Sequence, residues 1–134
     1  MTDTRQMLEA APKAVPLELG DVTAAIDACL NCLQTCIACA DSDLIEEDVR
    51  AMRACIALCQ TCADICDVTA RVLSRPGQWD HGVVRPLLEA CIRACTACSE
   101  ECDRHAEHHR HCAICAKACR TCIDACAVLF DAEQ

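Results

Sequence analysis

The sequence is dominated by cysteines that recur at intervals of three and four residues. The stretch from 112 to 126 reads CAICAKACRTCIDAC, and its five cysteines follow steps of 3, 4, 3 and 4. Steps of this size place side chains on one face of an α-helix. The other faces of this segment carry Lys117, Arg120 and Asp124, which are suited to solvent. The pattern therefore predicts a helix with a single row of sulfur atoms.

Three further segments repeat this pattern. Residues 29–39 hold four cysteines with steps of 3, 4 and 3, and residues 55–66 and 91–102 each hold four with steps of 4, 3 and 4. Helices with one apolar face bury it against one another, so we predict an all-α, antiparallel up-down-up-down four-helix bundle with a cysteine-lined core. The cysteines predicted to line this core are Cys29, Cys32, Cys36, Cys39, Cys55, Cys59, Cys62, Cys66, Cys91, Cys95, Cys98, Cys102, Cys112, Cys115, Cys119, Cys122 and Cys126.

Helix-capping and helix-breaking residues predict the organisation of the first part of the chain. Residues 1–20 are expected to form a short N-terminal arm or helix, and residues 21–134 a single Cys-rich bundle domain. Asp21 follows a glycine and is a good N-cap for a first core helix that reaches about residue 40. Residues 41–43 then resemble a short connection to the next helix.

The later helix ends are marked by similar signals. The second core helix is predicted over residues 44–74, because Pro76 and the glycine after it form the clearest break in the sequence. Asp80 is expected to cap the third helix. No Gly or Pro separates the third helix from the fourth, but an unbroken helix would leave its thiols without a partner face. We therefore predict a tight turn near residues 106–109.

Composition restricts the cellular setting and the partners. A net charge of −9 argues against nucleic acid and anionic membrane surfaces as partners. We see no export signal at the N-terminus, and no apolar stretch that approaches the length of a transmembrane span. The 17 cysteines are odd in number and sit in helical rather than loop-like sequence, unlike a secreted disulfide scaffold. We therefore expect a cytoplasmic protein with reduced thiols, a setting in which cysteine clusters commonly bind metal.

The arrangement of the thiols favours Cu(I) as that metal. Zinc prefers isolated tetrahedral sites, usually formed by loops that wrap the ion. Cu(I) is soft and accepts two or three sulfurs, which paired thiols offer along a whole helix. Two thiolates on each Cu(I) would leave uncompensated charge in an apolar core, so we expect thiolates shared between ions. The capacity should then exceed the eight ions that 17 cysteines could hold as separate pairs.

The ends of the cysteine rows differ in character. Continuing the same steps in one direction leads to thioether and imidazole side chains, and in the other direction to aliphatic ones. We predict a mouth through which the metal enters at the first end and a closed base at the second. The predicted mouth residues are Met52, His105, His108 and His109. The predicted base residues are Val22, Ala25, Leu73, Val84, Leu88 and Leu129.

Other interpretations of these residues stay open at this point. A free cysteine can simply fill a core, Met52 can be a core residue, and the histidine-rich stretch can be a solvated turn. We expect His111, His81 and Met7 to be solvated or packed residues rather than ligands.

We see no nucleophile–base pair or phosphate loop, so we do not expect an enzyme. Four other classes of function remain to be compared, and Cu(I) storage is the first. A metallothionein-like Zn/Cd thiolate sink is the main alternative to Cu(I) storage. An iron–sulfur carrier is disfavoured because its cluster needs four converging thiolates rather than parallel rows. A metal-free helical interaction module is the fourth class.

Taken together, the four Cys-striped segments, the closing CAICAKACRTCIDAC and the histidine-rich turn before it resemble the bacterial copper storage proteins, in particular their cytosolic branch. The resemblance covers residues 21–130. It implies a four-helix bundle that sequesters many Cu(I) ions through core thiolates, a homotetramer, and metal uptake at the end that holds Met52, His105, His108 and His109. A cytosolic copper chaperone is a candidate partner. Exported members carry a twin-Arg signal, which we do not find here.

Overall fold

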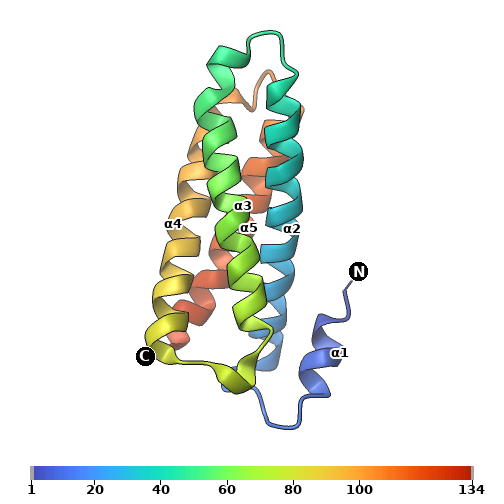
Figure 1. The fold of residues 1–134 in the computed structure, drawn as a ribbon, viewed down its shortest axis with the longest axis vertical. Helices are drawn as coiled ribbons and strands as arrows, with labels where there is room; N and C mark the ends of the chain where they lie inside the picture. The colour runs from blue at the N-terminus through green and yellow to red at the C-terminus, as the bar shows by residue number, and fades with distance from the viewer. Residues whose placement is uncertain (1, 134) are drawn as a thin grey trace.

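Four long helices form an antiparallel bundle in the computed structural model, which describes residues 2–133 (Figure 1). The chain runs up α2, down α3, up α4 and down α5, and the short helix α1 lies beside the lower part of α2 (Figure 1). This architecture confirms the predicted all-α fold. The bounds are α1 Thr4–Glu9, α2 Leu19–Leu44, α3 Arg53–Leu73, α4 His81–His105 and α5 Arg110–Ala132, with 3₁₀ turns η1 Val49–Met52 and η2 Pro76–Gln78.

Both ends of α2 differ from the prediction. Glu18, not Asp21, is the N-cap, and its carboxylate accepts a hydrogen bond of 2.7 Å from the backbone N–H of Asp21. At the other end, residues 41–43 are helical rather than a connection. Asp43 is one step of four beyond Cys39 on the same face, and it is fully buried. The buried face of α2 therefore continues one step beyond Cys39, the last cysteine of this helix.

The second core helix starts later than predicted. The segment after α2 forms η1, which Asp48 caps by accepting a hydrogen bond from the N–H of Ala51, and α3 begins only at Arg53. The other predicted boundaries are confirmed. Pro76 begins η2 just after α3 ends, Asp80 accepts a hydrogen bond of 2.8 Å from Gly82 N–H at the start of α4, and residues 106–109 separate α4 from α5.

Helix α2 corrects a further expectation. By length and composition alone it is long and apolar enough to cross a membrane, although the sequence seemed to hold no such stretch. Its apolar character comes largely from thiols, alanines and aliphatic residues, and the cysteine face is buried inside the bundle. A core helix of a bundle passes this test as readily as a membrane span does, so the property assigns no membrane role.

The base of the bundle is aliphatic, as predicted. Each of the predicted base residues, which are Val22, Ala25, Leu73, Val84, Leu88 and Leu129, has at most 1% of its surface exposed. The end of α5 is held over this base by Arg85, whose Nε donates a hydrogen bond of 2.7 Å to the Glu133 carbonyl and whose guanidinium lies 3.9 Å from the centre of the Phe130 ring. The carboxylate of Glu133 also contacts His81, and this contact raises the pKa of that imidazole. The base is therefore closed by both packing and polar contacts.

Two adjacent valines test the energetic role of the base. Val84 is 1% exposed, whereas Val83 on the same turn of α4 is 54% exposed. Val84→Ala removes buried methyl groups and should lower the free energy of unfolding by about 2 kcal/mol. Val83→Ala should change it by less than about 0.5 kcal/mol. Denaturant unfolding of the reduced, metal-free protein measures both values, and equal effects would contradict a well-packed base.

Candidate metal centre

All 17 cysteines lie inside the bundle as free thiols. Each has at most 1% of its surface exposed, so the four rows predicted from the sequence do face one another. They come from α2, α3, α4 and α5, and each helix contributes the face that the three- and four-residue steps select. The core is therefore a column of sulfur surrounded by helices.

Sulfur atoms from different helices are in direct contact along this column. Cys29 on α2 lies 3.6 Å from Cys122 on α5. Cys62 on α3 lies 3.6 Å from Cys95 on α4. Contacts also run along one helix, as between Cys32 and Cys36, whose sulfurs are 3.8 Å apart. A metal ion in the column can thus be bound by thiolates from one helix or from several.

The sulfurs form overlapping sets of four in which every Sγ lies within 4.8 Å of the others. Each set shares at least one cysteine with the next, so no boundary separates neighbouring sites. From the base toward the mouth, five of these sets are Cys29, Cys91, Cys122 and Cys126; Cys32, Cys66, Cys95 and Cys122; Cys32, Cys36, Cys62 and Cys119; Cys36, Cys98, Cys115 and Cys119; and Cys39, Cys59, Cys102 and Cys115.

The protonation of the column depends on these contacts. Hydrogen bonds from the thiols of Cys122 and Cys126 lower the pKa of Cys29 to about 6. The neighbouring Cys126 has a raised pKa, caused first by its contact with Cys122 and further by burial. A thiol that donates a hydrogen bond stabilises a thiolate beside it and keeps its own proton. Complete ionisation of the column therefore needs cations to replace the protons.

The predicted mouth residues lie at the end where α2 meets η1 and α4 meets α5. Met52 is buried at the end of η1. His105 is mostly buried, with its Nε2 3.0 Å from the Glu101 carboxylate. His109 lies 3.3 Å from Glu46, and its ring centre is 6.3 Å from that of His105. The structure thus brings His105 and His109 together at this end.

His108 does not join them. Its side chain is exposed, and its imidazole makes no hydrogen bond, ion pair or ring contact within the described residues 2–133. The turn between α4 and α5 directs it to solvent. The interpretation of His108 as part of a solvated turn fits this position.

Within residues 2–133, the histidine that contacts sulfur is His111, which was not among the predicted mouth residues. Its Nδ1 lies 3.3 Å from Cys39 Sγ and 3.6 Å from Cys112 Sγ, and its Nε2 lies 3.2 Å from Glu46 Oε1. His111 directly precedes Cys112, so it lies off the three- and four-residue steps that mark the cysteine face. However, it is in the first turn of α5, where side chains lean toward the N-terminus of the helix and so over the mouth. That directional rule was the signal that could have identified it.

Comparison with known proteins agrees with this geometry. A family model described as "Copper storage protein" matches residues 20–131. The chain belongs to the copper storage protein family. Among curated proteins, the uncharacterized cysteine-rich protein YhjQ of Bacillus subtilis (strain 168) is 36% identical over 103 residues, which are 77% of this chain and 90% of that protein.

Solved structures of copper storage proteins are similar throughout. The protein Ccsp from Streptomyces lividans, loaded with 10 copper equivalents, is 41% identical with a TM-score of 0.93, and the match covers 96% of this chain and 98% of that one. A second structure, of a cytosolic copper storage protein from Streptomyces lividans with five coppers, is 46% identical with a TM-score of 0.82, and covers 84% and 93%. The resemblance to this family noted in the sequence is confirmed.

In this copper storage protein a buried carboxyl group adjoins the last thiols of the column. Asp43 Oδ1 accepts a hydrogen bond from the Cys112 thiol at 3.7 Å and lies 3.6 Å from His111 Nδ1. Its Oδ2 is buried and has no hydrogen-bond partner in the described part of the chain. Burial, and next the neighbouring Cys55 thiol, raise the pKa of Asp43 to about 8. Burial also raises the pKa of Cys112, and the nearby Cys55 and Asp43 add to that shift.

Asp43 should make the stability of the metal-free protein depend on pH. The folded-state pKa of Asp43 lies above the ordinary value of 3.8, so folding favours the neutral acid. This contribution is full below pH 3.8 and is lost progressively as pH rises from there through about 8. Asp43→Asn keeps an acceptor for Cys112 and removes the charge. It should therefore raise the melting temperature by several degrees at pH 9 and by much less at pH 5, where only the first part of the contribution has been lost.

Thermal unfolding followed by circular dichroism in reductant measures this difference. Asp41→Asn, an exposed change on the same helix, is the matched control and should have no such pH dependence. Equal stabilisation by Asp43→Asn at both pH values would contradict the raised pKa of Asp43.

Proposed function

We propose that this copper storage protein holds multiple Cu(I) ions in its sulfur column, which sequesters free copper and keeps a reserve of it in the cytosol. The observation that carries the proposal is the overlap of the four-sulfur sets, since shared cysteines allow bridging thiolates. The proposed ligands are the 17 core cysteines. Support comes from the Streptomyces lividans structures, one of which is loaded with 10 copper equivalents and another of which is described as cytosolic.

The same overlap argues against a Zn/Cd sink. A single set of four sulfurs within 4.8 Å can accommodate a tetrahedral Zn²⁺. Neighbouring sets share cysteines, however, so they cannot all be filled as separate tetrahedral sites. Four thiolates around each Zn²⁺ would also leave a charge of −2 in a buried column, whereas one bridging thiolate for each Cu(I) is neutral. Monovalent soft ions can therefore fill a column of this kind more densely than Zn²⁺ can.

The end that holds Met52, His105 and His109 is the proposed uptake site. His111 joins this set because its imidazole lies 3.3 Å from Cys39, the last thiol of α2. Imidazole and thioether ligands bind Cu(I) less tightly than thiolates do, so an ion captured here can move on to sulfur. The opposite end offers no comparable route, because it is filled by aliphatic side chains.

Assembly and delivery are further parts of this proposal. Family resemblance supports a homotetramer, and a cytosolic copper chaperone is the proposed donor. The net charge of −9 supports the absence of nucleic acid and anionic membranes among its partners.

An anaerobic titration tests the storage function. Cu(I) added to the reduced protein against a competing chelator should bind tightly beyond eight ions per chain, the number that separate pairs of thiols would allow. Because each Cu–S bond releases a thiol proton, the apparent affinity should fall as pH is lowered from 8 to 6. Saturation at about four ions per chain with a preference for Zn²⁺ would instead favour the metallothionein-like Zn/Cd thiolate sink. A brown protein as purified would favour an iron–sulfur carrier.

Two histidine variants test the uptake end. His111→Ala removes the imidazole beside Cys39 and should slow the initial rate of Cu(I) loading about tenfold, which corresponds to one interaction of about 1.4 kcal/mol. His108→Ala removes an exposed imidazole that makes no hydrogen bond or ion pair within residues 2–133, and it should leave that rate unchanged. The final capacity should be equal in both variants, because the thiols remain. Stopped-flow measurements of Cu(I)–thiolate absorbance give the rates, and equal slowing in the two variants would contradict a site at His111.

A further inference from the structure

The mouth of the bundle holds a cluster of nitrogen and oxygen donors beside the sulfur column. Glu46 lies in the connection after α2, and its two carboxylate oxygens face two different imidazoles. Glu46 Oε2 lies 3.3 Å from His109 Nδ1, and Glu46 Oε1 lies 3.2 Å from His111 Nε2. The ring centres of His109 and His111 are 5.7 Å apart. One carboxylate therefore joins two histidines at the mouth.

These spacings are close to those of a tetrahedral metal site. With Zn–N and Zn–O bonds of about 2.0–2.1 Å, neighbouring ligand atoms lie about 3.3–3.4 Å apart. Two imidazoles on one such ion have ring centres roughly 5.2 Å apart, because each ring centre lies about 1.1 Å beyond its bound nitrogen. The observed N–O distances of 3.2 and 3.3 Å and the ring separation of 5.7 Å therefore need only small shifts to hold one ion.

The types of donor select the kind of ion. Carboxylate oxygen and imidazole nitrogen suit a borderline divalent ion such as Zn²⁺, and two histidines, one glutamate and a water form a known zinc coordination shell. Cu(I) is soft and prefers sulfur to a carboxylate. The cluster of Glu46, His109 and His111 thus favours a different metal from the one that the thiol column favours.

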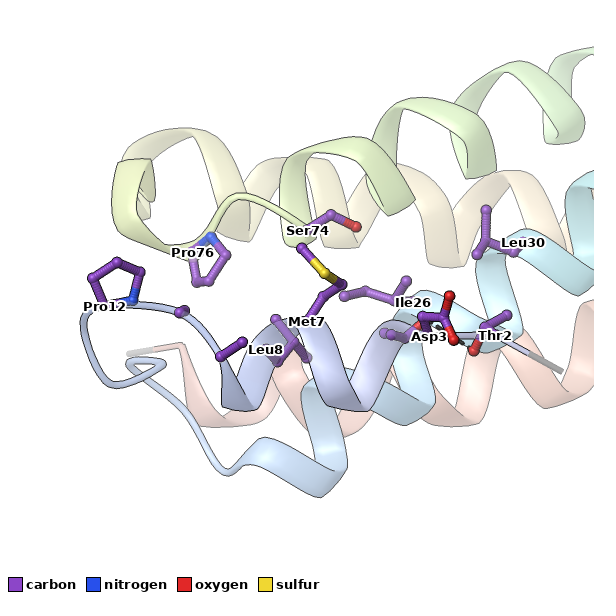
Figure 2. A pocket seen from close by; sticks show the side chains of 12 residues that line it. Thr2, Asp3, Met7, Leu8, Pro12, Ile26, Leu30, Ser74 and Pro76 are labelled. Carbon is purple, nitrogen blue, oxygen red and sulfur yellow. Dashed lines mark hydrogen bonds between the residues drawn. The ribbon is translucent and has the colours of Figure 1, made fainter.

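Donors of this kind do not gather at the surface groove beside α1. That groove has a volume of about 610 Å³ and lies near the base of the bundle, between α1 and the helices α2 and α3 (Figure 2). Met7, Leu8 and Ile26 give it an apolar lining, and Asp3 is the one carboxylate among the described residues that line it. A single carboxylate is too few ligands for a divalent ion, so the mouth is the better site.

His111 connects the cluster to the sulfur column, because its two ring nitrogens face different groups. Nε2 faces Glu46, whereas Nδ1 lies 3.3 Å from Cys39 Sγ and 3.6 Å from Cys112 Sγ. A neutral imidazole carries a proton on one nitrogen and a lone pair on the other. A metal at Nε2 therefore leaves the proton on Nδ1, and the nitrogen that faces sulfur then has no lone pair for Cu(I).

A buried carboxyl group lies where it can orient His111 for this role. Histidines that bind a metal commonly donate their second N–H to a carboxylate, which fixes the ring and its tautomer. Asp43 Oδ1 lies 3.6 Å from His111 Nδ1, and Asp43 is fully buried. Its Oδ2 has no hydrogen-bond partner within residues 2–133. Asp43 is thus an independent indication that Nε2 of His111 is placed to bind a metal.

We propose that Glu46, His109 and His111 form a divalent-metal site that takes Zn²⁺ and caps the mouth of the sulfur column. The ion ties the connection after α2 to the start of α5 and occupies the imidazole that faces Cys39. Passage of Cu(I) past His111 is then slowed in both directions. This inference rests on the proposed uptake of Cu(I) at this end and adds a regulation of it, because Zn²⁺ slows the exchange of stored copper without taking its thiols.

Co²⁺ absorption locates the site. The protein is first loaded anaerobically with Cu(I) until the Cu(I)–thiolate absorbance stops rising, so that the sulfurs are occupied, and Co²⁺ is then added as a probe for Zn²⁺. One equivalent of Co²⁺ should bind and give visible bands typical of nitrogen and oxygen ligands, and excess Zn²⁺ should remove these bands. An intense sulfur-to-cobalt charge-transfer band, or the absence of bound Co²⁺, would overturn the proposal.

The rate at which a Cu(I)-selective chelator removes copper from the loaded protein measures the cap. Zn²⁺ should slow this removal about tenfold, which corresponds to one interaction of about 1.4 kcal/mol. Mg²⁺ screens the net charge of −9 but does not favour imidazole, so it should have no effect. Glu46→Gln removes the charged ligand and should abolish the effect of Zn²⁺. Glu47→Gln makes the same change at the adjacent, exposed residue and should preserve it.

Two results of this measurement would contradict the cap: slowing of copper removal by Mg²⁺, and equal slowing by Zn²⁺ in the two glutamate variants. His109→Ala is a second variant that removes a different ligand, and circular dichroism shows whether it remains folded. It should weaken Zn²⁺ binding to the loaded protein about tenfold or more in competition with a fluorescent zinc indicator, and an unchanged affinity would overturn the site. The Cu(I) capacity of the wild-type chain without Zn²⁺ tests storage separately, so failure of the cap and failure of storage are distinguishable.

Discussion

Close contact between buried thiols is the constraint on which the rest of the structure depends. A protonated cysteine packs as a small apolar residue, so the metal-free column can form the core of a folded bundle. The same sulfur, once deprotonated, is a ligand for a soft metal. Contacts such as that between Cys62 and Cys95, with sulfurs 3.6 Å apart, suit both a packed apolar core and a set of metal ligands. The core can therefore be a hydrophobic interior before loading and a metal site afterward.

Periodicity predicted the parts of the molecule that repeat. Steps of three and four residues place a side chain on the same helix face wherever they occur, so the cysteine rows, the four helices and the aliphatic base followed from the sequence. The helix ends were harder to predict, because a cap depends on local geometry. Asp21 had the right residue type, yet Glu18 forms the cap. The prediction that residues 41–43 form a connection failed because the cysteine row continues through Asp43, a residue that was interpreted by its usual preference for turns.

The mouth was only partly predictable for a related reason. Three histidines were expected there from helical steps, but His108 points to solvent and His111 contacts Cys39. Steps along a helix identify a face, whereas the contacts of a residue in the first turn depend on how the neighbouring helix ends. The position of His111 is set by the meeting of α2 and α5, which are far apart in the sequence. Such contacts require the register between helices, and a single sequence does not specify that register.

The sealed aliphatic base has a consequence for the order in which the stored ions are used. If copper enters at the histidine-containing end, an ion deep in the column is separated from solvent by all those that arrived later. Because adjacent sets share cysteines, the thiols form a continuous path along the column. Turnover is then confined to the most recent arrivals, while the oldest ions form a kinetically protected fraction. The protein would thus combine a fast-exchanging supply and a long-term deposit within one bundle.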